Sequence, residues 1–221
     1  MNISFPAVLL LSSFSLCFGQ TKNECLKLFS DSASGYDLYG YKTKNEIKIP
    51  AKFLSTYSDR LCKMAIVLDP KKGWIGIDKN ERFILRSFIY DNGPDYVEEG
   101  LFRFTENEKM GFANLNGDKV IPAKFDFVTP FKDGLSEYSI GGERIYENGK
   151  TERQNEQEHI SLTDVHWIWG GNITEQGYMN KQGQKFREVS PLKNNTRTAI
   201  TIDHKKVLLN KKGQIIKRYE K

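Results

Sequence analysis

The residues best suited to metal or acid–base chemistry are three histidines, His159, His166 and His204. Their surroundings do not match a zinc site, because the sequence contains no H-E-x-x-H motif and no C-x-x-C pair. It also lacks the G-x-S-x-G turn of a serine nucleophile and the G-x-x-x-x-G-K loop that cradles phosphates. We therefore expect solvent-facing imidazoles, and we predict no catalytic residue, no metal ligand and no cofactor-binding residue.

Four carboxylates lie close together within residues 91–99, at Asp91, Asp95, Glu98 and Glu99. Such a group could hold calcium or act as an acid and base pair. The segment Gly93-Pro94 interrupts it where a calcium-binding loop needs ligands. We interpret the segment as a solvated acidic turn in an inserted loop.

Two tryptophans form the most conspicuous aromatic pair. In an extended strand, Val165, Trp167 and Trp169 lie on one face and Ile168 lies on the other. If the tryptophans are exposed, they could line a groove for a carbohydrate or a peptide. If they are buried, they pack between adjacent structural units, which is the commoner role of this side chain. Trp74 is assigned to the core.

Positive charge is concentrated at the C-terminal end. Residues 205–221 contain seven lysines and arginines against one glutamate, a net charge of +6, whereas the whole chain carries +5. Three basic pairs lie before, within and after a predicted hairpin over residues 206–216, which gathers them near its two ends: Lys205-Lys206, Lys211-Lys212 and Lys217-Arg218. We expect either a surface for an anionic lipid, glycan or protein, or a solubilising cap at the end of the chain.

The first 19 residues have no charged side chain and an apolar stretch too short to span a bilayer comfortably. They are typical of a secretory signal peptide, and small Gly19 predicts cleavage before Gln20. A lipid anchor on Cys17 is the alternative, but bulky Leu16 stands where that motif needs a small residue. Export makes nucleic acid an improbable partner.

Removal of residues 1–19 leaves two cysteines, Cys25 and Cys62. In an oxidising compartment this pair could close a loop and stabilise the fold by about 4 kcal/mol in the chain-entropy description. The alternative is two separate buried thiols.

The remaining chain is organised by repeats. The pentapeptide I-P-A-K-F occurs at residues 49–53 and again at 121–125. Turn dipeptides recur at intervals of 30 to 36 residues, which predicts about six units; they begin at Asn45, Asn80, Asn116, Asn148, Gln182 and Lys212.

One unit can be followed from residue 110 to residue 138. An alternating strand over 111–115 is followed by the turn Asn116-Gly117 and a second strand over 119–121. Pro122 is expected to end the second strand, and residues 135–140 return as a third. We predict that Gly117 and Gly183 adopt positive φ and that Asn116 helps to close its turn.

With these features the chain resembles the WG-repeat family, which is found mainly in bacterial proteins, many of them exported. The resemblance is good for residues 40–140 and thin for 141–221, and it rests on Gly73-Trp74, Gly111-Phe112, Gly177-Tyr178, the turns, both I-P-A-K-F segments and F-K-D-G-L at 131–135. It implies a β-rich repeat architecture and no established catalytic residues.

The predicted fold is therefore all-β: an open, solenoid-like stack of short repeats, with propeller-like closure as the alternative. A short N-terminal helix is expected over residues 24–29 and a long polar loop over 148–164. The segments are a signal peptide (1–19), an N-terminal cap (20–39), clear repeats (40–147) and degenerate repeats with the basic hairpin (148–221).

The composition excludes a polytopic membrane protein, with 38% hydrophobic residues and a mean hydropathy of −0.55. We expect a non-catalytic exported β-repeat protein that presents a surface to a protein or an envelope component. The alternatives are a glycan-binding or glycan-acting module and a structural component of a larger complex.

Overall fold

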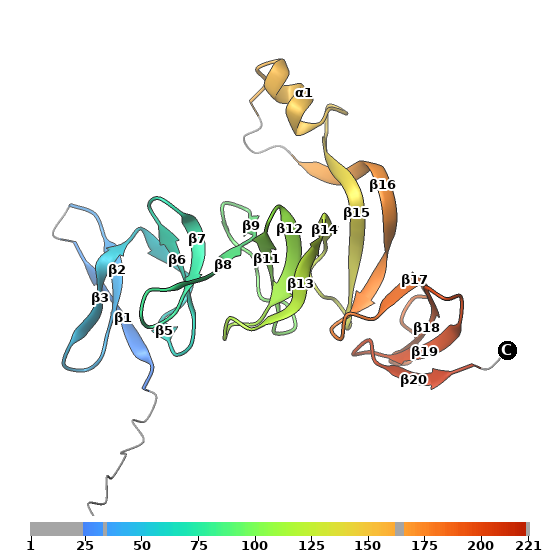
Figure 1. The fold of residues 1–221 in the computed structure, drawn as a ribbon, viewed down its shortest axis with the longest axis horizontal. Coiled ribbons are helices and arrows are strands. Elements are labelled where there is room, and N and C mark those ends of the chain that lie inside the picture. The colour runs from blue at the N-terminus through green and yellow to red at the C-terminus, as the bar shows by residue number, and fades with distance from the viewer. Residues whose placement is uncertain (1–23, 33–34, 162–165, 220–221) are drawn as a thin grey trace, which may run out of the picture.

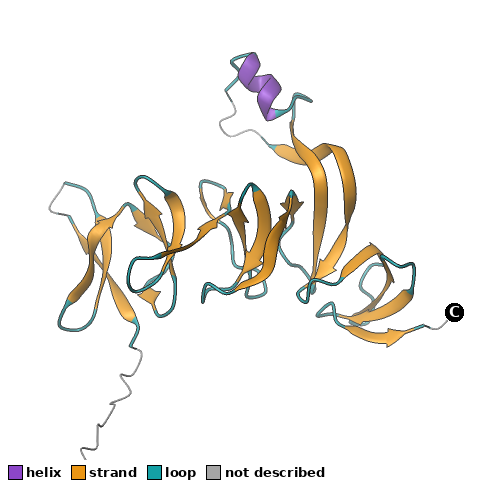
Figure 2. Cartoon of the chain, in the orientation of Figure 1, coloured by secondary structure: helices purple, strands orange, loops and turns teal. Residues whose placement is uncertain are grey.

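A computed structural model describes residues 24–32, 35–161 and 166–219. The expected signal peptide, Val165, Glu220 and Lys221 lie outside this part of the chain. Within it the secondary structure is almost entirely β, with twenty strands and one short helix (Figures 1 and 2). All strand pairs are antiparallel, and the strands do not close into a barrel.

Most strands belong to five three-stranded antiparallel meanders that follow one another along the chain and along the long axis of the molecule (Figure 1). They comprise β1 (Leu26–Asp31), β2 (Leu38–Lys42) and β3 (Ile47–Phe53); β6 (Ala65–Asp69), β7 (Gly73–Ile77) and β8 (Phe83–Ser87); β11 (Phe102–Glu106), β12 (Lys109–Ala113) and β13 (Lys119–Phe125); β15 (Leu135–Tyr146), β16 (Trp167–Asn180) and β17 (Lys185–Val189); and β18 (Thr196–Thr201), β19 (Lys206–Asn210) and β20 (Ile215–Arg218).

Short strands connect the meanders. They are β4 (Ser55–Thr56), β5 (Arg60–Leu61), β9 (Ile89–Tyr90), β10 (Gly93–Pro94) and β14 (Phe127–Val128). Hydrogen bonds join the second and third meanders, with β4, into one seven-stranded sheet, and the fourth and fifth, with β14, into another. The first meander forms a four-stranded sheet with β5.

The core lies between successive meanders. Buried side chains form four clusters in the described residues, and each cluster joins one meander to the next. Trp74 is buried, as predicted, in the cluster between the second and third meanders. Each meander therefore covers the apolar face of its neighbour, which is how stacked repeats build a continuous core.

The turns between second and third strands share one mechanism in four meanders. At Asp78, Asn114, Asn180 and Asn210 a side-chain Oδ1 accepts hydrogen bonds from backbone N–H groups two and four residues later. The predicted positive φ at Gly117 and Gly183 is confirmed, at 88° and 74°. In the third meander the side chain that closes the turn is that of Asn114, and Asn116 contributes its backbone N–H to this closure.

The I-P-A-K-F segments form β3 and β13, and each strand is irregular at its proline. Contrary to the prediction, β13 does not end at Pro122 but continues to Phe125, which pairs with Met110. The bulged backbone approaches Gly111 so closely that a Cβ there would lie 2.4 Å from the carbonyl oxygen of Ile121. Gly40 faces the first segment in the same way.

Two predicted elements differ from the structure. The segment expected to form an N-terminal helix contains strand β1, because β2 and β5, distant in sequence, pair with its two edges. The expected loop over 148–164 contains helix α1 (Glu152–Gln157), which starts at a capping box formed by Thr151 and Gln154.

Strand β15 begins as predicted at Leu135, but it continues to Tyr146 and pairs along its length with β16. It is the first strand of the fourth meander, not the last of the third. Together β15 and β16 form an arm that projects from the row of meanders and carries α1 near its tip (Figure 1). The dipeptide Asn148-Gly149 therefore lies in this extension and not in a repeat turn.

Candidate functional site

The last two strands, β19 and β20, form the predicted basic hairpin, which we define as residues 205–219. It lies at the C-terminal end of the row (Figure 1). Val207 and Leu209 point into the core between the fourth and fifth meanders, so the alternate side chains of β19 remain outside. β20 pairs only with β19, which leaves its other edge open.

The cations gather at the two ends of this hairpin, as the sequence predicts. At one end, Val207 pairs with Arg218 and Leu208 with Lys217, which brings these cations beside Lys206. Lys211 and Lys212 lie in the turn at the opposite end.

Two of the four predicted lysines are engaged by carboxylates. Lys205 Nζ lies 2.7 Å from Asp203, and hydrogen bonds from Lys205 and Thr201 lower the pKa of Asp203 to about 2. Lys211 Nζ lies 3.8 Å from Asp133.

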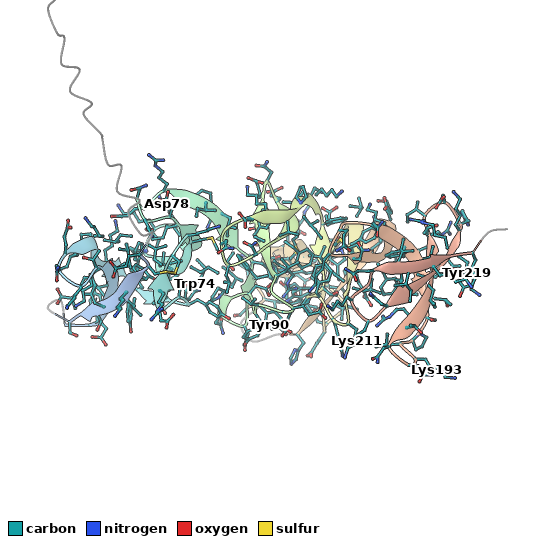
Figure 3. All side chains as sticks on the ribbon, turned by 90° about the horizontal axis from the view of Figure 1, so that it is seen from below. Trp74, Asp78, Tyr90, Lys193, Lys211 and Tyr219 are labelled. Atoms are coloured by element: carbon teal, nitrogen blue, oxygen red, sulfur yellow. A yellow bond between two sulfur atoms is a disulfide. The ribbon has the colours of Figure 1, made fainter. Side chains whose placement is uncertain are left out.

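The other cations of the hairpin have no carboxylate partner among the residues that the structure describes. Within the described residues no carboxylate lies in salt-bridge distance of four of them, Lys206, Lys212, Lys217 and Arg218. Lys206 and Lys217 instead lie 5.6 and 5.0 Å from the ring of Tyr219, which sequence reasoning did not single out (Figure 3). The positive charge available to a partner therefore differs from the lysine set predicted from the sequence.

A groove of about 490 Å³ runs beside the hairpin, and sequence reasoning missed it. We call it the glutamine groove; its lining residues are Gln182, Gln184, Gln214, Ile215, Ile216 and Arg218. It lies where the turn of the fourth meander meets that of the fifth, and Asn180 Nδ2 donates a hydrogen bond across this junction to the carbonyl oxygen of Gly213 at 2.9 Å. The segments N-K-Q-G-Q at 180–184 and N-K-K-G-Q at 210–214 supply its two walls.

The tryptophan pair lies in the first residues of β16, toward the end of the arm that carries α1, and is half-buried against Phe127. The ring of Trp169 stacks on Phe127 at 5.1 Å, and the ring of Trp167 meets the same phenyl edge-on at 5.7 Å. Arg144 covers Trp167 at 4.9 Å, and Trp169 Nε1 donates to the carbonyl oxygen of Gly141 at 3.0 Å. These contacts favour a packing role over an open ligand platform.

The acidic segment is not a solvated turn throughout. Asp95 is buried and paired with Arg103, whose Nε donates to Asp95 Oδ2 at 3.0 Å and whose Nη1 donates to the carbonyl oxygen of Val128 at 3.2 Å. Glu99 accepts hydrogen bonds from Lys181 and the backbone N–H of Gly134; burial raises the pKa of Glu99, but these bonds outweigh it and lower the pKa. Both carboxylates hold meanders together, which local sequence could not reveal.

A second polar cluster lies where the arm meets β17. The hydroxyl of Tyr138 and Nζ of Lys185 both donate to Glu175 Oε1, at 2.8 and 2.7 Å. Lys185 and Tyr138 lower the pKa of Glu175, whereas burial and the Glu175 carboxylate raise the pKa of Tyr138. The tyrosine therefore keeps its proton at neutral pH and acts as a hydrogen-bond donor.

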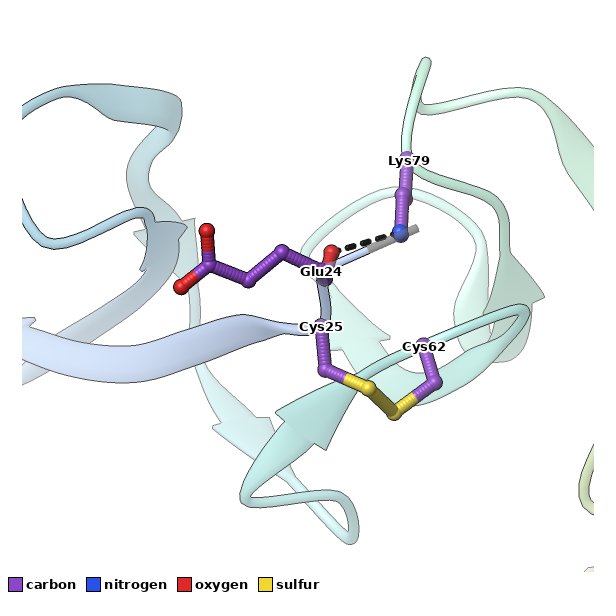
Figure 4. Close-up of a disulfide and its surroundings, with 4 residues drawn as sticks. All are labelled: Glu24, Cys25, Cys62 and Lys79. Carbon is purple, nitrogen blue, oxygen red and sulfur yellow. Dashed lines mark hydrogen bonds between the residues drawn. A yellow bond between two sulfur atoms is a disulfide. The ribbon is translucent and has the colours of Figure 1, made fainter. Parts of the chain in front are cut away.

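The structure joins Cys25 and Cys62 in a disulfide (Figure 4). The bond connects the residue before β1 to the residue after β5, and Lys79 Nζ donates to the carbonyl oxygen of Glu24 beside it at 2.7 Å. In the part of the chain that the structure describes, no three His, Cys, Asp or Glu side chains are grouped so that they could hold a metal ion.

Comparison with known proteins supports the repeat assignment. A family model described as "WG containing repeat" matches residues 110–143, so the resemblance to WG repeats is confirmed for this segment. No curated protein matches the sequence.

One solved structure with detectable similarity is that of BamB from Moraxella catarrhalis. It is 13% identical in sequence, with 89% of this chain and 73% of that chain covered and a TM-score of 0.25. A TM-score of this size does not establish a shared fold. Among the described residues, no helix has the length and apolar character needed to cross a membrane.

Proposed function

We propose that this protein, which carries a WG repeat at residues 110–143, is a non-catalytic exported β-repeat protein whose basic hairpin binds an anionic protein or envelope component. The observation that carries the proposal is the group of cations on the last hairpin that have no carboxylate partner in the described structure, Lys206, Lys212, Lys217 and Arg218. Each cation near an anionic surface contributes about 1 kcal/mol, so four together support measurable binding.

The architecture we propose is an open stack in which the five meanders are the repeat units. It is supported by the four core clusters, each of which joins consecutive meanders, while none in the described residues joins the first meander to the fifth. In such a stack the terminal unit has one face without a neighbour. The basic hairpin belongs to the fifth meander, and its cations Lys206, Lys212, Lys217 and Arg218 are exposed in the described structure, which supports contact with a partner.

Export is supported by the apolar leader and by the Cys25–Cys62 disulfide, since disulfides persist in oxidising compartments. Intact-mass measurement of the protein recovered outside the cytoplasm should show a chain that begins at Gln20. Recovery of exported protein that still begins at Met1 would contradict a cleaved leader.

Binding is tested by co-sedimentation with vesicles that contain phosphatidylglycerol, at low salt, with phosphatidylcholine vesicles as the neutral comparison. We expect the native protein to sediment with the anionic vesicles, and a variant with Lys206, Lys212, Lys217 and Arg218 changed to Gln to remain in solution.

The matched control changes Lys44, Lys63, Lys71 and Lys72 to Gln, four exposed lysines of the first two meanders. It has the same net charge as the hairpin variant and should bind like the native protein. Equal loss in the two variants would mean that net charge, and not the hairpin, governs binding. Absence of binding by the native protein would reduce the hairpin to a solubilising cap.

A further inference from the structure

The glutamine groove has a chemical character that its two asparagine-led turns impose. In the fourth meander, Asn180 Oδ1 accepts hydrogen bonds from the backbone N–H groups of Gln182 and Gln184. This fixes which end of the Asn180 amide is the oxygen, because backbone N–H groups can only donate. Its Nδ2 therefore faces Gln184, and Gln184 must present its oxygen in return, at 2.7 Å.

The fifth meander repeats this arrangement 30 residues later. Asn210 Oδ1 accepts from the backbone N–H groups of Lys212 and Gln214, and Asn210 Nδ2 donates to Gln214 Oε1 at 2.9 Å. In both turns the glutamine oxygen is occupied within the protein. One lone pair of each glutamine oxygen is thus used, whereas both hydrogens of each donor Nε2 have no partner within the described residues, which makes Nε2 the main group that each glutamine offers a ligand.

The remaining lining residues complete a set suited to one kind of ligand. Arg218 adds a planar guanidinium, which pairs well with a carboxylate, and none of the six lining residues is acidic. Gln182 has no side-chain partner in the described structure, so its amide can both donate to and accept from a hydroxyl group. Ile215 and Ile216 supply an apolar surface, of which Ile216 is 52% exposed.

A ligand that satisfies this set needs carboxylate oxygens for the donors, hydroxyl groups for the free amide and a C–H face for the isoleucines. We propose that the glutamine groove binds the hexuronic acid units of an acidic polysaccharide. This inference rests on the proposed function, since it names the anionic partner of the C-terminal meander. An acidic peptide offers the carboxylates but leaves the hydroxyl-binding amide and the apolar surface poorly used.

The probe is trigalacturonic acid, titrated into the full-length mature protein by calorimetry at low salt and neutral pH. We expect binding that weakens at least tenfold for the methyl ester of the same trisaccharide, which keeps the hydroxyl groups and loses the charge. An oligoglutamate with the same number of carboxylates should also bind at least tenfold more weakly.

The decisive variant changes Gln184 and Gln214 to Met, which removes the oriented donors and keeps every cation. The matched control changes Gln157 and Gln176 to Met, two exposed glutamines outside the groove. We expect at least a tenfold loss of trisaccharide affinity in the groove variant and none in the control. The groove variant also loses the acceptors of Asn180 Nδ2 and Asn210 Nδ2, so its thermal melt should be somewhat lower than that of the control, with both proteins folded at the temperature of the titration. The groove variant should still sediment with anionic vesicles.

The outcomes separate this inference from the proposed function. Vesicle binding by the native protein without trisaccharide binding would overturn the groove assignment alone. Trisaccharide binding that survives in the groove variant, or equal affinity for oligoglutamate, would also overturn it. A native protein that binds neither vesicles nor the trisaccharide would refute the proposed function as well.

Discussion

Neighbouring lysines in the C-terminal hairpin differ in how much of their charge reaches solvent. Lys205 and Lys211 have carboxylates within salt-bridge distance, whereas Lys206 and Lys212 do not. An exposed ion pair contributes little to stability, but it removes a cation from the set that can attract a partner. The binding capacity of this surface therefore depends on individual pairings and not on the count of basic residues.

At Gly134, next to the start of the fourth meander, the backbone comes very close to the turn of the fifth meander. The φ of Gly134 is +77°, and a Cβ there would lie 2.0 Å from the carbonyl carbon of Lys212 and 2.3 Å from the nitrogen of Gly213. Gly183 has a similar φ of +74°, with no atom near its Cβ position. Gly183→Ala should cost about 1 kcal/mol from backbone strain alone.

For Gly134→Ala we expect the same backbone strain and, in addition, a steric clash. Its loss of unfolding free energy should therefore exceed that of Gly183→Ala by at least about 2 kcal/mol. Urea denaturation of both variants measures the difference. Similar losses for the two would show that the turn at Gly134 does not pack against the last hairpin.

Asp126 makes stability depend on pH in a defined direction. Burial raises its pKa, but hydrogen bonds from Lys109 and from the backbone N–H of Gly141 outweigh burial and lower the pKa below 3.8. The unfolded chain therefore binds the proton more readily, and stability is lost as the pH falls below about 4. In Asp126→Asn this contribution should be absent, so unfolding free energies measured between pH 6 and 3 should decline less steeply. A slope unchanged from the native protein would contradict the assignment.

At the scale of elements, the turns were predictable from sequence and the strand partners were not. The positive φ of Gly117 and Gly183 was predictable because each glycine lies in a turn that an Asn side chain closes. Such a turn is determined by about five consecutive residues. The prediction of a helix over residues 24–29 is wrong because the strands that pair with β1, namely β2 and β5, lie outside that segment, and β5 follows it by about 30 residues. Pairing with distant strands overrides local propensity.

The candidate site was predictable only in part for the same reason. The charge of the basic hairpin is visible in the sequence, but its pairing with Asp133, a residue of the turn before β15, is not. The glutamine groove left a sequence signature, because Gln184 and Gln214 occupy the same place in two turn segments. What the sequence could not show is that the two turns meet.

The first meander is held by the Cys25–Cys62 bond, and its reduction tests how much that bond contributes. The non-reduced protein should contain no reactive thiol at these positions, and reduction should lower the unfolding free energy by about 2–4 kcal/mol. We expect amide exchange to accelerate first in β1 and β2, which the bond anchors. Two reactive thiols in the non-reduced protein would contradict the pairing.

At the scale of the whole molecule, the proposed open stack predicts an elongated particle. A compact globule of this size would have a radius of gyration of roughly 17 Å. Small-angle X-ray scattering of the mature protein should give a value larger by about a quarter or more, with a distance distribution extended to long separations. A radius within about 1 Å of the compact value would favour closure of the array.

In the proposed function, the anionic partner meets the fifth meander, at one end of the proposed open stack. Cations that meet an anionic surface lose most of their attraction as the Debye length falls from about 30 Å at 0.01 M salt to about 8 Å at physiological ionic strength. If binding depended instead on charges spread along the row of meanders, it would weaken with salt to the same extent whichever four lysines were removed. The salt dependence of the hairpin variant therefore separates a local site from a diffuse one.

The most direct test is the dissociation constant for phosphatidylglycerol vesicles, measured across that salt range for the native protein, the hairpin variant and the control variant of equal net charge. We predict steep weakening with salt for the native protein and the control, and weak binding with little salt dependence when Lys206, Lys212, Lys217 and Arg218 are changed to Gln. Identical salt dependence in the two variants would contradict the central claim that the last hairpin is the binding surface.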